Sequence, residues 1–173
     1  MTEFLEFING LLAYSTWEKF ANLHGIFATL GLILFGAALA LTPFFSKAKK
    51  YLRWFRTAVT LLLLDIFLLT LNGFLIYQPY RAGLPTSPRS IILASDRPWL
   101  HQIVFEHKEF LAFAPLLLVG VAVFMAWYFG GSIKGSRYDG LRKVIFWSLF
   151  LALIFTFVIA GEAVLVTKFA PVS

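Results

Sequence analysis

The sequence contains no cysteine and few charged residues. Without cysteine the chain has no disulfide framework, no zinc site or iron–sulfur cluster held by thiolates, and no cysteine nucleophile. Only 14% of its 173 residues are charged, against about 25% in an average soluble domain, and 60% are hydrophobic. This composition leaves too little polar surface to coat a globule in water, so it indicates a membrane protein.

Catalytic motifs are also missing. The chain has no glycine-rich phosphate loop, no serine nucleophile elbow and no carboxylate pair with catalytic spacing. No catalytic residue is therefore predicted, and a non-catalytic role inside a larger complex is favoured over an enzyme.

Four apolar blocks are each long enough to cross a bilayer, which takes a helix of about 20 residues. They cover residues 20–41, 58–76, 110–129 and 144–166. We predict a single all-α membrane domain over residues 1–173, built as an up-and-down bundle of four transmembrane helices. An even number of spans places both termini on the same side of the membrane.

Local patterns predict the helix ends and one loop. Apolar residues at helical spacing between Phe4 and Leu12 predict a short interfacial helix before the first span, which Ser15 and Glu18 then open as a capping box. The segment 78–95 holds three prolines and a glycine, so we expect a loop without a helix there. Pro115 is expected to kink the third span.

Basic residues are concentrated in the links after the first and third spans. These two links hold nine cations and one acid, whereas the opposite side of the bundle holds six of each. Because basic flanks tend to stay in the cytoplasm, both termini and the 78–95 loop are expected outside it, in an inner or plasma membrane. The net charge of +6 then reflects topology, and no nucleic-acid partner is expected. The nine cations are Lys47, Lys49, Lys50, Arg53, Arg56, Lys134, Arg137, Arg142 and Lys143.

All three histidines fall in the outer half of the predicted bundle. His24 and His107 lie at similar depths on the first and third helices, and Glu162 lies level with His24 on the fourth. Two imidazoles at matched depth are what a b-type haem with two axial histidines requires, so His24 and His107 are predicted to bind the haem iron.

Three other residues have supporting roles in this haem hypothesis. Gly25 would let a porphyrin approach the helix backbone, and Glu162 would orient an imidazole. His101 is the alternative ligand, but it points about 120° away from His107, so the two cannot share one iron.

The second span carries two polar residues at helical spacing. Asp65 and Asn72 are seven residues apart and share one helix face. Asp65 lies near the bilayer centre, where a charged group costs about 2.5–3.5 kcal/mol, so this face is expected to point into the bundle. Asp65 either holds helices together or handles protons. Together with Glu162, these residues and the aromatic walls also suit a quinone site.

Two fragments, Leu23-His24-Gly25 and Glu106-His107-Lys108-Glu109-Phe110, carry a resemblance to a known family. In these fragments and in its four helices the chain resembles small four-helix cytochrome b-type membrane subunits, including b561-like and formate-dehydrogenase-type anchors. The resemblance implies haem b and electron transport. The chain departs from that family because its second and fourth spans contain no histidine. Only one haem with two histidine ligands could therefore be bound.

Three functional hypotheses remain open. The first is a membrane subunit of a respiratory or photosynthetic electron-transfer complex, with one haem b near the outer face, that relays electrons between a quinone or haem partner and an outer-side redox protein. The second is a cofactor-free accessory subunit that packs against lipids, pigments or the helices of other membrane subunits. The third is a small transporter or proton path that uses Asp65 and Glu162.

The charge count makes a prediction about orientation. A protein tag fused to either terminus should be cleaved by protease added to the outside of intact cells, because both termini are expected outside the cytoplasm. Tags on both termini that are protected from external protease, yet cleaved after the cells are permeabilised, would reverse the predicted orientation.

Overall fold

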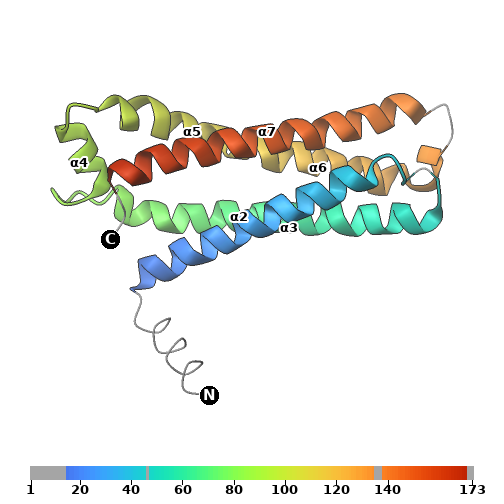
Figure 1. Cartoon of the computed structure of the whole chain (residues 1–173), viewed down its shortest axis with the longest axis horizontal. Helices are drawn as coiled ribbons and strands as arrows, with labels where there is room; N and C mark the ends of the chain where they lie inside the picture. The colour runs from blue at the N-terminus through green and yellow to red at the C-terminus, as the bar shows by residue number, and fades with distance from the viewer. Residues whose placement is uncertain (1–14, 46, 135–137, 171–173) are drawn as a thin grey trace, which may run out of the picture.

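The computed structural model describes residues 15–45, 47–134 and 138–170, and long helices dominate these ranges. The helix expected between Phe4 and Leu12 lies outside them. Figure 1 shows the elements in chain order. They are α2 (Thr16–Leu41), α3 (Lys49–Tyr80), α4 (Pro88–Ala94), the π-helix η1 (Leu100–Phe105), α5 (Glu106–Leu111), α6 (Phe113–Tyr128), the 3-10 helix η2 (Gly130–Lys134) and α7 (Asp139–Phe169).

Four helical stretches are long and apolar enough to cross a membrane, namely α2, α3, the run from η1 to α6, and α7. Only 17% to 28% of the residues in their most apolar windows are buried inside the bundle. Most of their apolar side chains therefore face outward, which is the arrangement that lipid requires. The predicted all-α, four-span membrane bundle is confirmed.

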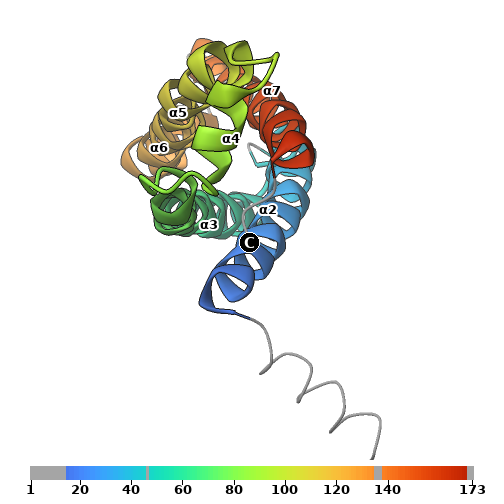
Figure 2. The same ribbon diagram turned by 90° about the vertical axis from the view of Figure 1, so that its left-hand side faces the viewer.

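The four long helices are arranged in a ring, seen end-on in Figure 2. Around this ring α2 packs against α3 and α7, and α6 packs against the same two helices. The short helix α4 lies across one end, which we call the α4 end (Figures 1 and 2). We call the opposite end, which carries η2 and the first turns of α3 and α7, the basic end. An apolar core that includes Phe35, Val59, Leu62, Val119 and Leu149 fills the bundle between them.

The segment between the second and third spans differs from the prediction of a loop without a helix over 78–95. Helix α3 continues to Tyr80, and α4 forms further along. The side chain of Ser87 accepts a hydrogen bond from a backbone N–H in the first turn of α4, and Pro88 occupies a position where its missing N–H costs nothing. Burial of Ile92 then holds α4 on the bundle. These cap signals outweigh the prolines.

The predicted capping box is confirmed, and the third span is interrupted near Pro115. Ser15 and Glu18 form a reciprocal capping box at the start of α2. In the third span α5 ends at Leu111 and α6 begins at Phe113. Pro115 has no N–H to donate to the carbonyl of Leu111, which explains why the helix is interrupted at this point.

Helices α2 and α3 approach each other closely at one position near the middle of the bundle. A Cβ atom added to Gly31 would lie 2.7 Å from Oδ2 of Asp65, so the absence of a side chain on α2 makes room for the carboxyl of α3. Gly36 also lies on α2, but a Cβ atom added there would have no other atom within 4 Å.

The close approach predicts a matched pair of effects on stability. Gly31→Ala should lower the thermal unfolding temperature of the detergent-solubilised protein, because overpacking typically costs about 1–3 kcal/mol. Gly36→Ala should leave this temperature unchanged or raise it. Combining Gly31→Ala with Asp65→Ala should recover most of the loss, and a strictly additive double variant would show that the two positions do not pack against each other.

Candidate functional site at the α4 end

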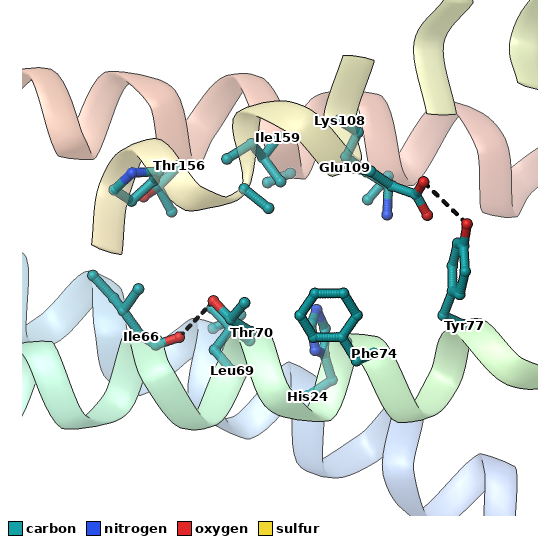
Figure 3. Close-up of a pocket in the computed structure, with 16 residues that line it drawn as sticks. His24, Ile66, Leu69, Thr70, Phe74, Tyr77, Lys108, Glu109, Thr156 and Ile159 are labelled. Atoms are coloured by element: carbon teal, nitrogen blue, oxygen red, sulfur yellow. Dashed lines mark hydrogen bonds between the residues drawn. The ribbon is translucent and has the colours of Figure 1, made fainter. Parts of the chain in front are cut away.

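A cavity of about 180 Å³ lies inside the bundle toward the α4 end. Residues from α2, α3, α5, α6 and α7 line it, and most of them are apolar. Figure 3 shows Lys108, Glu109 and Tyr77 at one end of the cavity and Ile66 at the other. The site therefore combines a polar end with apolar walls, which is the usual composition of a pocket for an amphipathic small molecule.

His24 enters the cavity from α2, opposite a glycine of α3. A Cβ atom added to Gly73 would lie 3.4 Å from Cε1 of His24, so the imidazole packs directly against α3 at this position. The Nδ1 atom of His24 is buried and has no hydrogen-bond partner among the described residues. A buried imidazole nitrogen without a partner costs free energy, and a ligand with a complementary polar atom would recover it.

Glu109 is held in place by Tyr77 of α3 and by Arg81, which follows the last residue of that helix. Its Oε2 accepts a hydrogen bond from the hydroxyl of Tyr77 at 3.1 Å and another from Nη2 of Arg81 at 3.1 Å. Arg81 also donates to Glu106 at 2.6 Å. Glu109 therefore lines the cavity with its partners already in place.

Lys108 supplies a cation to the same cavity. Its Nζ lies 4.5 Å from the centre of the Phe105 ring, and no described carboxylate lies within 4 Å of it in an ion pair. The ammonium therefore retains hydrogen-bond donors that a bound molecule can use.

His107 and Glu162 form a pair between the third and fourth spans. Nδ1 of His107 lies 2.6 Å from Oε1 of Glu162, whose other oxygen is buried and has no hydrogen-bond partner among the described residues. Sequence reasoning proposed Glu162 as a residue that orients an imidazole, and the geometry brings it to His107. The side chain of His107 is 55% exposed, and it does not line the cavity.

His101 is engaged on both ring nitrogens. Its Nε2 accepts a hydrogen bond from Nε of Arg89 at 3.1 Å, and its Nδ1 lies 3.1 Å from the hydroxyl of Tyr80. Because arginine can only donate, the neutral ring carries its proton on Nδ1 and donates it to Tyr80. This buried network ties α4 to α3 and η1, and it leaves neither nitrogen of His101 free to bind a metal.

Of the two predicted haem ligands, only His24 lines the cavity. His24 lines the cavity, as do Lys108 and Ala163, which follow His107 and Glu162 in the sequence. His24, His107 and Glu162 therefore all lie toward the α4 end, but His107 does not line the cavity that His24 lines. Gly25 is exposed and has open space around it. Within the ranges that the structure describes, no group of three or more potential metal-ligating side chains gathers.

Asp65 and Asn72 both point into the bundle and are 4% exposed. Neither oxygen of Asp65 has a hydrogen-bond partner among the described residues, and the same holds for Oδ1 of Asn72. Their inward orientation agrees with the argument from the cost of placing charge in lipid.

Sequence reasoning missed four residues on which the site depends, Gly73, Tyr77, Lys108 and Glu109. A signal was present on α3, where the cavity residues Ile66, Thr70, Gly73 and Tyr77 recur every three or four positions and so form one helix face. Lys108 gave no comparable signal, because a lysine at the start of a span normally marks the membrane boundary.

Comparisons with protein-family models, with curated proteins and with solved structures find no match for this chain. The function of the site is therefore argued from its own residues.

Proposed function

We propose that this four-span membrane protein binds a quinone in the cavity at the α4 end, as a subunit of an electron-transfer complex. The observation that carries the proposal is the convergence of His24, Lys108 and the Tyr77–Glu109 pair on one otherwise apolar cavity. A quinone has this same division, since its two carbonyl oxygens accept hydrogen bonds while its ring and tail are apolar.

The polar residues supply both donors and acceptors. The Lys108 ammonium can donate a hydrogen bond to a carbonyl oxygen of the oxidised ring, and Nδ1 of His24 can do the same in the tautomer that carries its proton there. In the other tautomer Nδ1 accepts a hydrogen bond from a hydroxyl of the reduced ring. Glu109, oriented by Tyr77 and Arg81, can accept a hydrogen bond from a hydroxyl of the reduced form. Both forms of the ligand thus find partners in one arrangement.

The size of the cavity favours a quinone with a single ring over a larger cofactor. Pockets for drug-sized ligands measure about 300–1,000 Å³, and this cavity measures about 180 Å³. It can hold a quinone ring, while the isoprenoid tail would have to leave between the helices into the lipid. A porphyrin is too large for the cavity as it stands.

The charge distribution supports an orientation with the α4 end outside the cytoplasm. Among the described residues the basic end carries Lys47, Lys49, Lys50, Arg53 and Arg56 in one short stretch, whereas cations and acids of the α4 end pair with each other. In this orientation the quinone site lies near the outer face. The exposed apolar faces would contact lipid and other membrane subunits, and an outer-side redox protein would exchange electrons at the α4 end.

Binding of decyl-ubiquinone to the purified protein tests this proposal. His24→Leu should raise the dissociation constant about tenfold, because losing one buried hydrogen bond costs about 1–3 kcal/mol. Equilibrium dialysis in detergent with absorbance detection would measure the constant.

His107→Leu is the matched control, since it removes a histidine at the same end of the bundle that does not line the cavity. It should leave quinone binding unchanged. Equal losses in the two variants, or no saturable binding by the unaltered protein, would contradict the proposal.

A single b-type haem bound by His24 and His107 is a second candidate. The observation that favours it is the contact between Glu162 and Nδ1 of His107, because carboxylates commonly fix histidine ligands of metals through the second ring nitrogen. His24 and His107 do not share a cavity, so haem binding would require the helices around them to move apart.

The haem hypothesis predicts a spectrum. The protein purified from haem-replete cells should show a split Soret difference band and a sharp alpha band on reduction, and both His24→Ala and His107→Ala should abolish them. Purified protein that lacks these bands would exclude the haem. If quinone binding were absent as well, the cofactor-free accessory subunit would be the better description.

A further inference from the structure

At the basic end a second cavity, of about 530 Å³, is lined by Lys49, Arg53 and Arg56 of α3 together with Trp127 of α6 and Gly131 of η2. We propose that this basic cleft binds the phosphate of an anionic phospholipid head group. The inference is independent of the quinone proposal, because it concerns the opposite end of the bundle and none of the same residues.

The three cations lie on one face of α3. Positions 49, 53 and 56 are separated by four and three residues, so their side chains follow each other along one side of the helix. None of the three forms an ion pair within the described ranges. Asp139 is the only described acid at this end, and it is engaged by Arg142 at 2.6 Å and Lys143 at 3.8 Å.

The position of Lys49 at the start of α3 is electrostatically unfavourable without an anion. Helix α3 begins at Lys49, its first turn contains no acid, and the preceding Ala48 provides no side-chain cap. The N-terminus of a helix carries a partial positive charge, which repels a cation in the first turn. A phosphate in the basic cleft would offset both sources of positive potential.

Arg56 is held rigidly at the back of the cleft. Its Nε donates to the carbonyl of Ala126 at 3.0 Å, and its guanidinium carbon lies 4.9 Å from the ring centre of Trp127. The backbone passes close by at Gly130, where an added Cβ would lie 2.9 Å from Nη2 of Arg56 and where φ is +46°. A guanidinium fixed in this way loses little side-chain entropy when it binds an anion.

The surroundings favour a lipid as the source of the phosphate. Trp127 donates through its indole N–H to Thr60 at 3.0 Å, and tryptophan is common at the head-group level of membranes. Toward the middle of the bundle, Leu61, Leu64 and Phe124 are exposed on α3 and α6, where acyl chains would lie. Basic pockets beside transmembrane helices recognise anionic head groups in this way.

The test compares two lipids of identical acyl chains by native mass spectrometry of the purified full chain. Phosphatidylglycerol should bind more tightly than phosphatidylcholine. The Lys49→Gln and Arg53→Gln substitutions should each weaken phosphatidylglycerol binding about fivefold, the change expected for losing one cation near an anionic lipid. Binding of phosphatidylcholine should not change.

Lys47→Gln and Lys50→Gln are matched controls. They remove the same charge from the same stretch of chain, but these lysines lie over the rings of Phe44, Tyr51 and Trp54 and do not line the cleft. They should leave the preference for phosphatidylglycerol intact. Equal losses in both sets of variants would show that only general surface charge is at work and would overturn the proposal.

Two further measurements complete the test. Inorganic phosphate should compete poorly with phosphatidylglycerol, and displacement by low phosphate concentrations would make a free anion the ligand instead. Brominated phosphatidylglycerol should quench the tryptophan fluorescence of the unaltered protein more than that of the Trp127→Phe variant. This measurement leaves every charged residue of the cleft in place. Equal quenching of the two proteins would place the lipid elsewhere.

Discussion

The absence of water inside a bilayer is the constraint on which this structure depends. A peptide group without a hydrogen-bond partner costs several kcal/mol in hydrocarbon, so each crossing segment must satisfy its own backbone as a helix. The chain follows this rule even at its irregular points. At Ala112, between α5 and α6, the backbone keeps helical dihedral angles and its N–H still donates to the carbonyl of Lys108. The π-helix at residues 100–105 also satisfies its own backbone, and it contains His101 with its polar network at the end of the bundle.

The same constraint sends polar side chains to two separate places. At the α4 end, acids and cations occur in similar numbers and pair across helices, as Arg81 does with Glu106 and Glu109. At the basic end the cations have few acidic partners among the described residues, so their field is compensated from outside the chain. One end can therefore hold a neutral molecule between preformed hydrogen-bonding groups, while the other attracts an anion. The two proposed ligands differ for this reason.

The fold could be predicted from the sequence because span length and charge asymmetry are one-dimensional signals. The capping box at Ser15 and the effect of Pro115 are local in the same way. Helix α4 was missed because three prolines nearby were given more weight than the cap at Ser87, and the deciding term was tertiary, namely the burial of Ile92. The candidate site was predicted in part. Matched depth placed His24, His107 and Glu162 at one end, but depth says nothing about rotation around the helix axis, which decided that His24 lines the cavity and His107 does not.

The interface between α2 and α3 shows how rotation is fixed once the helices pack. Each helix places a polar side chain opposite a glycine of the other, His24 against Gly73 and Asp65 against Gly31. The two helices are antiparallel, and the paired positions are separated by seven residues on α2 and eight on α3, about two turns on each. The contact at Gly31 is the tight one, because an added Cβ atom there would lie 2.7 Å from the Asp65 carboxyl, whereas one at Gly73 would make ordinary van der Waals contact with His24 at 3.4 Å. The close fit of Asp65 against Gly31 restricts the rotation of α2 relative to α3, and the carboxyl near the bilayer centre belongs to the same helix interface as the imidazole of the site.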